Sequence, residues 1–362
     1  VNCKSQNAQI DRQPAVAGQF YPADTAELNS ALKNLFSKAV ESKNIKNVVA
    51  IISPHAGYVY SGEAAASSFN QIDPDRNYEN IFIIGSSHKF TFDGASIYSI
   101  GNFITPLGTV KVNRKLAEEL IKKNKFLVDR IDAHLYEHSL EVQLPFLQSR
   151  MKKDFKIVPI VIGTQNSEMC KKIADALRPF LNNKNLFIIS TDFSHYPNYT
   201  DAVKIDKATA DAIASNSSKI LLQTLENNEM KGIPNLATSL CGWTSVLTLL
   251  YMTENNANVE IKNIEYKNSG DSEFGDKNKV VGYNSLVVSL KEQKMGFNLN
   301  EQERKDLLSI ARRTIDMYVN ENNIPEIDAG KLTANIKTKC GAFVTLHKQK
   351  MLRGCIGHFE AD

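Results

Sequence analysis

The pattern that most constrains this chain is a set of short, almost uninterrupted apolar runs that alternate with segments of helical period. The runs are rich in valine, isoleucine and phenylalanine and cover residues 47–52, 80–85, 156–163 and 185–191. Strands buried on both faces have this composition and length. Strands that alternate with helices form crossover units. The pattern predicts an α/β fold with a mixed, largely parallel sheet flanked by helices.

Other segments extend this prediction. Residues 22–36, "PADTAELNSALKNLF", have the period of an amphipathic helix, with Asp24 and Glu27 at capping-box spacing. A further helix is expected across "TSLCGWTSVLTLLYM" (238–252), and a last strand across 280–290. These elements belong to the same α/β unit.

The C-terminal part of the chain has a different character. Residues 291–300 are polar and without period, which predicts a linker. Residues 301–320 have the pattern of a new amphipathic helix, and a hairpin with its turn near 347–350 should follow. We therefore expect one domain over 1–295 and a small α+β segment over 296–362.

Composition narrows the function classes. Apolar residues make up 42% and charged residues 23% of the chain, as in ordinary soluble globular proteins. The formal net charge of +3 is small, and no block of like charges occurs, so nucleic acid is not predicted as a partner. No apolar run approaches the ~18–20 residues of a membrane span.

Cysteine usage and the N-terminus bear on location. The five cysteines are widely spaced and form no CxxC pair, which argues against a disulfide framework and a zinc-finger-type site. This favours the cytoplasm. The chain begins Val-Asn-Cys and not with Met, so an exported or lipid-anchored form, with a segment removed before Cys3, stays open.

Polar residues fall directly after three of the predicted strands. His55 follows the first, His88 follows the second, and Asp192 and His195 follow the run 185–191. Ligand sites in open α/β sheets collect at the carboxyl ends of the strands. A lone histidine is usually structural, but three at matching positions favour a site. Because imidazole is the commonest metal ligand near neutral pH, we expect a metal there.

Two further segments are ambiguous from the residues alone. In "YEHSLEVQLPFL", His138 and Glu141 are spaced to share one helical face, whereas Glu137 fits a solvated helix start. Cys241, at the head of an apolar helix, fits small-residue packing. A thiolate ligand favoured by the helix N-terminus is the alternative.

Seven motifs in order resemble those of the Memo-like proteins, the B component of the AmmeMemoRadiSam group. They are "AGQFYP", "SPHAGYVYSG", "IIGSSHKF", "YEHSLEVQLPFL", "IVPIVIG", "STDFSHY" and "LCGW", within residues 12–290. Residues 297–362, with "LRGCIG", resemble the beginning of an AMMECR-type domain, the A component. That second domain is apparently truncated, because a complete one runs well beyond the hexapeptide.

The resemblance implies a fold shared with class III (LigB-type) extradiol dioxygenases. It makes His55, His88 and Cys241 the ligands of one transition metal, with iron first and copper or zinc as alternatives. It places His195, near Asp192, as the acid–base histidine. His138 and Glu141 would line the same cleft.

Three functions are consistent with these residues. The first is a metal-dependent oxidoreductase for a small molecule or modified nucleotide, in a pathway with a radical-SAM protein, where His195, Asp192 and His138 handle protons. The second is a non-catalytic metal-holding or phosphopeptide-binding module with a rim of Lys89, Phe90, Tyr58 and Trp243. The third is metal-assisted hydrolysis.

Overall fold

The protein is described from a computed structural model, in which residues 9–291, 299–338 and 340–358 are the described ranges. The chain divides into two compact units, residues 1–292 and 293–362. We describe each unit by itself. Most of the predicted linker, the predicted boundary after residue 295, and Cys3 lie outside the described residues.

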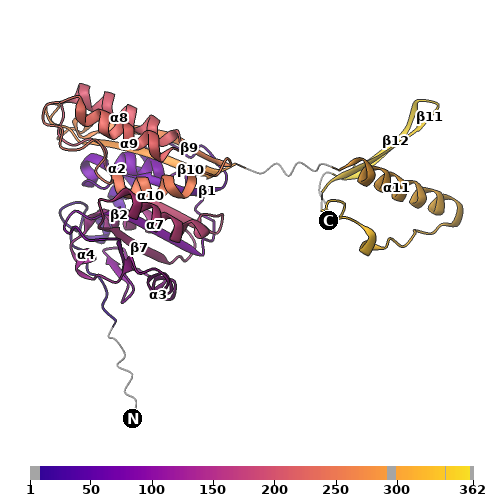
Figure 1. Ribbon diagram of the computed structural model, residues 1–362, viewed down its shortest axis with the longest axis horizontal. Coiled ribbons are helices and arrows are strands. Elements are labelled where there is room, and N and C mark those ends of the chain that lie inside the picture. Colours follow the sequence, from indigo (N-terminus) through magenta and orange to yellow (C-terminus); the bar gives the residue numbers. More distant parts are fainter. Residues whose placement is uncertain (1–8, 292–298, 339, 359–362) are drawn as a thin grey trace, which may run out of the picture. The chain divides into compact units, whose positions relative to one another are not determined.

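The first unit is built on a twisted sheet of eight strands within the described residues (Figure 1). The central strands β7, β2, β8 and β1 run parallel, while β10 and β3 pair antiparallel with them at the two sides. This confirms the predicted mixed, largely parallel α/β sheet. In spatial order the strands are β6 (Leu127–Val128), β3 (Ala95–Ile97), β7 (Ile157–Ile162), β2 (Asn80–Ser86), β8 (Asn185–Ser190), β1 (Val48–Ser53), β10 (Gly282–Leu290) and β9 (Val259–Asn268). A separate short hairpin pairs β4 (Phe103–Thr105) with β5 (Gly108–Val110).

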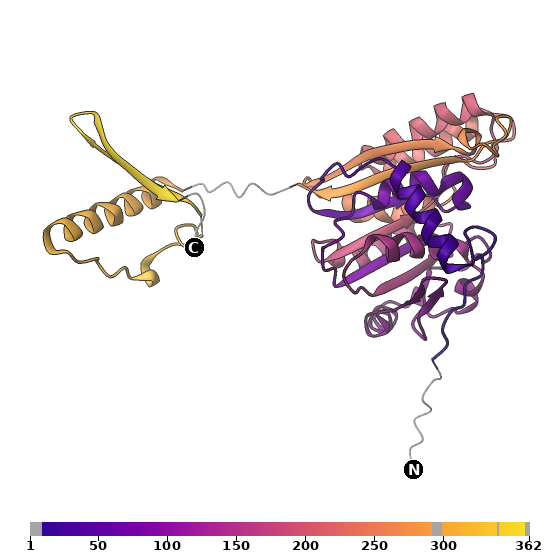
Figure 2. The same cartoon turned by 180° about the vertical axis from the view of Figure 1, so that it is seen from behind.

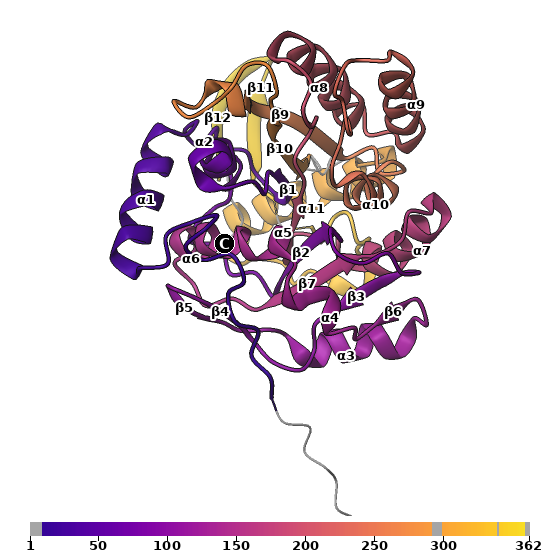
Figure 3. The same cartoon turned by 90° about the vertical axis from the view of Figure 1, so that its left-hand side faces the viewer.

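Helices cover both faces of the sheet. One apolar cluster joins the sheet to α1 (Thr25–Lys38), α2 (Tyr58–Phe69), α4 (Asp132–Leu135), α5 (His138–Glu141) and α6 (Gln143–Arg150). The other joins it to α3 (Arg114–Lys123), α7 (Ser167–Leu177), α8 (Tyr199–Ala214), α9 (Ser218–Met230) and α10 (Trp243–Thr253). Figure 1 looks onto the face of the sheet covered by α7 and α10, and Figure 2 shows the indigo helices on the opposite face. In Figure 3, α1 and α7 lie on opposite sides of the sheet. Single 3-10 turns follow α7 (η1, Arg178–Phe180) and β9 (η2, Ser269–Asp271).

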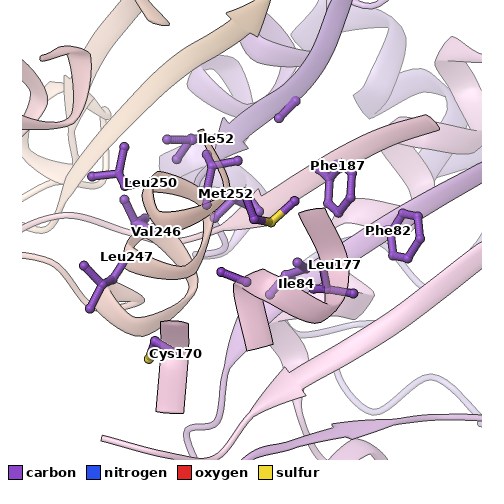
Figure 4. Close-up of a cluster of buried hydrophobic side chains, with 14 of the residues drawn as sticks. Ile52, Phe82, Ile84, Cys170, Leu177, Phe187, Val246, Leu247, Leu250 and Met252 are labelled. Carbon is purple, nitrogen blue, oxygen red and sulfur yellow. The ribbon is translucent and has the colours of Figure 1, made fainter. Parts of the chain in front are cut away.

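The packing explains why the strand segments are apolar throughout. On one face, Leu177 of α7 and Leu250 of α10 pack over Ile52, Ile84 and Phe187 from three adjacent strands (Figure 4). All five side chains are fully buried. Because the opposite face is covered as well, every residue of these strands is buried, and alternation with polar residues is lost.

Strand register brings three loops to one edge of the sheet. Ser53 at the end of β1 and Gly85 near the end of β2 both lie beside Ser190, the last residue of β8. The chain segments that follow these strands therefore leave the sheet at the same level. This edge is where His55, His88 and Asp192 are delivered. None of the helices in the described ranges combines the length and apolar character of a membrane span.

The second unit contains one long helix and a hairpin in its described part. Helix α11 (Glu301–Glu321) begins with a capping box between Asn300 and Glu303, as predicted for 301–320. A 3-10 turn η3 (Ala329–Lys331) follows, and β11 (Ala342–Lys348) pairs antiparallel with β12 (Met351–His358). The turn at Gln349 and Lys350 confirms the predicted hairpin.

A buried carboxylate anchors the loop after β8 to α8. Asp206 accepts hydrogen bonds from the backbone N and the Oγ of Ser194, at 2.9 and 3.0 Å, and from the hydroxyl of Tyr266 at 2.9 Å. Burial outweighs these hydrogen bonds and raises the pKa of Asp206 to about 7. The folded state therefore holds this proton more tightly than the unfolded chain does.

We predict that Asp206→Asn flattens part of the pH dependence of stability. An acid whose pKa is raised on folding stabilises the protein less as pH rises, here between about 4 and 7. Asparagine keeps one acceptor oxygen, and its amide can donate to both hydroxyls. In denaturant titrations, the free energy of unfolding should fall less, or rise more, from pH 5 to pH 8 in the variant than in the wild type. An equal difference in both proteins would contradict the prediction.

Candidate metal centre

His55 lies two residues beyond β1 and is held on two sides. It is 1% exposed, and its backbone N donates to Asp192 Oδ1 at 2.7 Å. Its Nδ1 lies 3.0 Å from Ser190 Oγ. The Ser190 hydroxyl donates its own proton to the carbonyl of Ser139 at 2.6 Å and accepts from Gln143 Nε2 at 3.0 Å. The serine thus has no proton left for the imidazole.

This fixes the tautomer of His55. Nδ1 carries the proton and donates it to Ser190, so Nε2 has a free lone pair. Nε2 is buried and has no hydrogen-bond partner among the described residues. Burial, with the charges of His88 and His138 adding to it, lowers the pKa of His55 well below its ordinary value. A neutral imidazole with a free Nε2 is the form that binds a metal.

His88, just after β2, is oriented in the same way by Glu137. Oε2 of Glu137 accepts from the His88 backbone N at 2.8 Å, and Oε1 lies 2.9 Å from His88 Nδ1. Glu137 is 1% exposed and also caps α5 by accepting from Ser139 N. Glu137 thus stands at a helix start, as one interpretation of the sequence had it, but it is buried and not solvated. The buried carboxylate directs His88 Nε2 towards Cys241, whose Sγ lies 3.2 Å away.

Cys241 precedes α10, as predicted, and is anchored by its backbone. Its N–H donates to the carbonyl of Asp192 at 3.1 Å. One ligating atom each from His55, His88 and Cys241 lies within 4.8 Å of the other two. Ligand atoms that share one metal ion, each at a bond length of about 2.0–2.3 Å, are separated from one another by distances comparable to these. Nitrogen and sulfur donors of this kind fit a transition metal.

Electrostatics at His88 favour a positive charge. Burial disfavours the cation, but the hydrogen bonds to Cys241 and Glu137 outweigh it and raise the pKa of His88 to about 10. The pKa of Glu137 responds in the opposite sense: burial alone would raise it, yet the hydrogen bonds and charge of His88 lower it to about 2. A metal ion would supply the same positive charge in place of the proton.

Asp192 and His195 lie beside His55. Asp192 Oδ2 is 3.9 Å from His55 Nε2 and 3.9 Å from His195 Nε2. Like His55 Nε2, the buried His195 Nε2 has no partner in the described part of the chain. Burial raises the pKa of Asp192 to about 7 and lowers that of His195 to about 4. Near neutral pH His195 is therefore neutral, and a proton held by this pair resides on Asp192.

His138 completes the cluster of imidazoles. Its ring centroid is 4.5 Å from that of His88, 5.3 Å from that of His55, and 4.9 Å from the ring of Phe20. Burial, followed by the charge of His88, lowers the pKa of His138 to about 4. His88, Glu137 and His138 form a second group of closely spaced ligating atoms.

Two predicted cleft residues have structural roles. Glu141 is fully buried and forms an ion pair with Arg12, while also accepting from the backbone N of Ala15 and Val16 and from the hydroxyl of Tyr21. Tyr58 is 5% exposed and donates its hydroxyl to the carbonyl of Val142 at 2.7 Å. Both polar groups are engaged within the fold, although Tyr58 also lines a groove at the start of α2. The predicted place of these two residues at a ligand cleft stays a prediction.

The remaining rim residues lie at the surface. Lys89 is exposed and close enough to His138 for its charge to lower the pKa of that imidazole. Trp243, the first residue of α10, is partly buried and donates its indole N–H to Gln165 Oε1 at 3.0 Å. The placement of both is compatible with the predicted rim.

Sequence reasoning missed the residues that orient the imidazoles. Ser190, Gln143 and Glu137 are buried polar groups whose partners are far away in the chain. Glu137 adjoins His138 in the motif "YEHSLEVQLPFL", so its place in the sequence indicated a position near the site. Ser190 follows an apolar run and carried none. Phe20 stands in "AGQFYP", and its ring contact with His138 was not foreseen.

A groove lies beside this cluster. Its volume is about 1010 Å³, and its lining includes Phe20, Tyr60 and Phe274 together with the N-terminal part of α2. Because Phe20 also contacts His138, the groove and the cluster share a wall. Acidic side chains of Glu27, Glu63 and Glu273 contribute to the lining.

The fold and site define an α/β protein with two histidines and a cysteine gathered at the carboxyl edge of its sheet. Comparison with known proteins supplies the family. The family described as Memo-like protein matches residues 12–287, and the family AMMECR1 matches residues 308–362. The chain belongs to the Memo-like protein family.

Curated relatives agree with this assignment. MEMO1 family protein Ta0237 of Thermoplasma acidophilum is 34% identical over 280 residues, which is 77% of this chain and 98% of that protein. A MEMO1 family protein of Nitrosopumilus maritimus is 32% identical over 280 residues, covering 76% of this chain and 98% of its own. A solved structure, the uncharacterized protein JW3007 of Escherichia coli K12, matches with a TM-score of 0.40 and 11% identity over 66% of this chain and 99% of that one.

We predict that Glu141→Gln destabilises the first unit strongly. The substitution leaves the buried Arg12 guanidinium without its counter-charge, and breaking such a pair costs about 3–5 kcal/mol. Denaturant unfolding should show this loss, whereas the matched change of the exposed Glu226 to Gln should stay within about 0.5 kcal/mol of wild type. Equal effects of the two changes would contradict a structural role for Glu141.

Proposed function

We propose that His55, His88 and Cys241 hold one transition-metal ion and that the protein is a metal-dependent oxidoreductase. One observation carries the proposal: the buried, unpartnered Nε2 of His55 lies with His88 Nε2 and Cys241 Sγ in one cluster of ligating atoms. Ser190 and Glu137 act as the second layer of hydrogen bonds that orients metal-binding imidazoles. Both Nδ1 atoms are thereby directed away from the centre.

The donor set guides the choice of metal. Two imidazoles and a thiolate are softer than the two-histidine, one-carboxylate set of non-haem iron sites. We propose iron first, with copper or zinc as alternatives. When bound, iron or copper supplies a redox-active Lewis acid with positions open to a ligand.

The other residues of the site would handle protons. His195 Nε2 and Asp192 Oδ2 lie 3.9 Å apart beside His55, and either could hold a proton or pass it to a group bound next to them. His138, whose ring contacts those of His88 and Phe20 in tilted arrangements, offers a second nitrogen at the wall of the groove. The substrate class we propose, a small molecule or modified nucleotide in a pathway with a radical-SAM protein, rests on the family resemblance alone.

The groove favours a second candidate function. A volume of about 1010 Å³ and an aromatic lining are suited to an extended ligand such as a peptide segment. In this alternative the metal centre and the groove form a binding module without turnover. The acidic side chains in the lining would repel a strongly negative ligand, so they argue against a phosphopeptide that fills the whole groove. Metal-assisted hydrolysis, the third function, has no specific observation in its favour.

Metal content tests the ligand set. Protein purified without oxygen should contain close to one equivalent of a transition metal, and His55→Ala or Cys241→Ser should lower this to less than about a tenth. Losing one ligand leaves a two-donor site, and even the loss of an orienting partner costs 10–100-fold in affinity. Elemental analysis measures the content, and the thiolate absorbance of iron or copper identifies the sulfur ligand.

Matched controls separate ligation from general damage. Cys355→Ser removes an exposed thiol and His347→Ala an exposed imidazole, both in the second unit, and both proteins should keep the wild-type metal content. Far-UV circular dichroism should show that all four variants are folded. A wild-type content near zero, or unchanged content in His55→Ala, would show that the ligand set is wrong.

A second experiment distinguishes an enzyme from a binding module. In His195→Ala the three ligands and their orienting partners are untouched, so metal content should stay near wild type. If the protein is an enzyme, oxygen uptake by the iron-loaded protein in the presence of ascorbate should fall at least about 100-fold, as expected for loss of an acid–base group. Wild-type rates in His195→Ala would exclude the proposed proton role.

A further inference from the structure

A second cavity lies at the end of the sheet opposite the candidate metal centre. Its volume is about 450 Å³. It is lined by the segment before β1, by the segment between α2 and β2, and by Arg150 at the end of α6. The lining includes Val48, the first residue of β1, whereas His55 lies beyond the other end of that strand. The cavity therefore shares no residue with the metal cluster.

The charges around this cavity are unbalanced. Lys46, Arg76 and Arg150 line it, against a single acidic residue, Asp73. None of the three cations forms an ion pair with a carboxylate of a described residue. The nearby Asp75 is paired with Lys152 at 3.0 Å. The lining thus presents an excess of positive charge to a partly enclosed volume.

The two arginines are held by neutral acceptors only. Arg150 donates from Nε and Nη2 to the carbonyls of Ile72 and Asn70, at 2.6–3.0 Å. Arg76 donates from Nη2 to the carbonyl of Asn183 at 2.5 Å. These bonds fix both guanidinium groups without neutralising them. Each arginine keeps its Nη1 donors unused.

Tyr78 adds a buried polar group to the same lining. It is 3% exposed, and its hydroxyl has no hydrogen-bond partner among the described residues. The Arg76 guanidinium lies 5.5 Å from the centre of its ring. Buried hydroxyls in folded proteins are almost always bonded, so one without a partner calls for an explanation. A ligand acceptor that reached this hydroxyl would provide that partner.

We propose that this cavity binds the phosphate group of a small phosphorylated molecule, with Arg76, Arg150 and Lys46 supplying charge and Tyr78 donating a hydrogen bond. Phosphate presents several acceptor oxygens and two negative charges, which match fixed guanidinium donors. The volume is in the range of small-molecule sites, so an organic part of the ligand fits beside the phosphate.

Isothermal titration calorimetry tests the proposal with inorganic phosphate and ribose 5-phosphate as probes, at constant ionic strength. The wild-type protein should bind both saturably. Arg76→Gln should weaken binding roughly tenfold or more, the effect expected for losing one charge-assisted hydrogen bond. Tyr78→Phe should weaken binding severalfold without lowering the unfolding temperature in the absence of phosphate, because its hydroxyl makes no bond in the free protein and burying it unpaired is costly.

Two controls make the outcome decisive. Arg178→Gln removes an exposed arginine that is paired with Asp175 and lies outside the cavity, and it should bind phosphate like the wild type. Acetate at the same concentration should not bind. The proposal is overturned if the wild type shows no saturable binding in the millimolar range, if both cavity variants bind as wild type does, or if acetate binds as well as phosphate. Because the cavity shares no residue with the metal cluster, these variants should keep the wild-type metal content, and failure here is independent of the metal centre.

Discussion

The candidate site depends on Asp192, which joins the segments that carry two of the three predicted ligands. Its carboxylate accepts the backbone N–H of His55, and its backbone carbonyl accepts the N–H of Cys241. Parallel pairing of β1, β8 and β2 brings these segments to the same edge, but pairing alone does not fix the loops beyond the strands. The hydrogen bonds of Asp192 do so, and they place the imidazole and the thiol on either side of one cluster.

Glu137 and Glu141 are both buried, but Glu141 stabilises the fold whereas Glu137 orients a residue of the candidate site. Glu141 is bonded to Arg12, Ala15, Val16 and Tyr21, so its carboxylate ties residues 12–21, here called the N-terminal strap, to α5. Glu137 lies at the start of the same short helix and accepts from His88 at both the backbone and the ring. The N-terminal strap therefore supports α5 from one side while α5 presents Glu137 to the site on the other.

Much of the fold was predictable because its determinants are local. Continuous apolar runs predict strands covered on both faces, and their alternation with helices predicts crossover connections. A largely parallel sheet follows from these two features. Because parallel strands end at the same edge, we could also expect His55, His88 and Asp192 to meet there. The roles of Glu141 and Tyr58 were not predictable, since each is decided by a distant partner: Arg12 for the first, the carbonyl of Val142 for the second. The role of the Ser190 hydroxyl in fixing the tautomer of His55 was not predictable either, because the sequence shows only a serine at the end of an apolar strand.

The charges of the cluster give a physical reason for a cationic occupant. Glu137 is ionised well below neutral pH, and a thiolate at Cys241 would add a second negative charge beside His88. The imidazoles of His55, His138 and His195 are kept neutral by burial, so they offer lone pairs but no compensating charge. A single proton on His88 balances only one of the two anions. A divalent ion bound to His55, His88 and Cys241 would balance both, which supports the proposal of a metal rather than a proton as the partner of a deprotonated thiol.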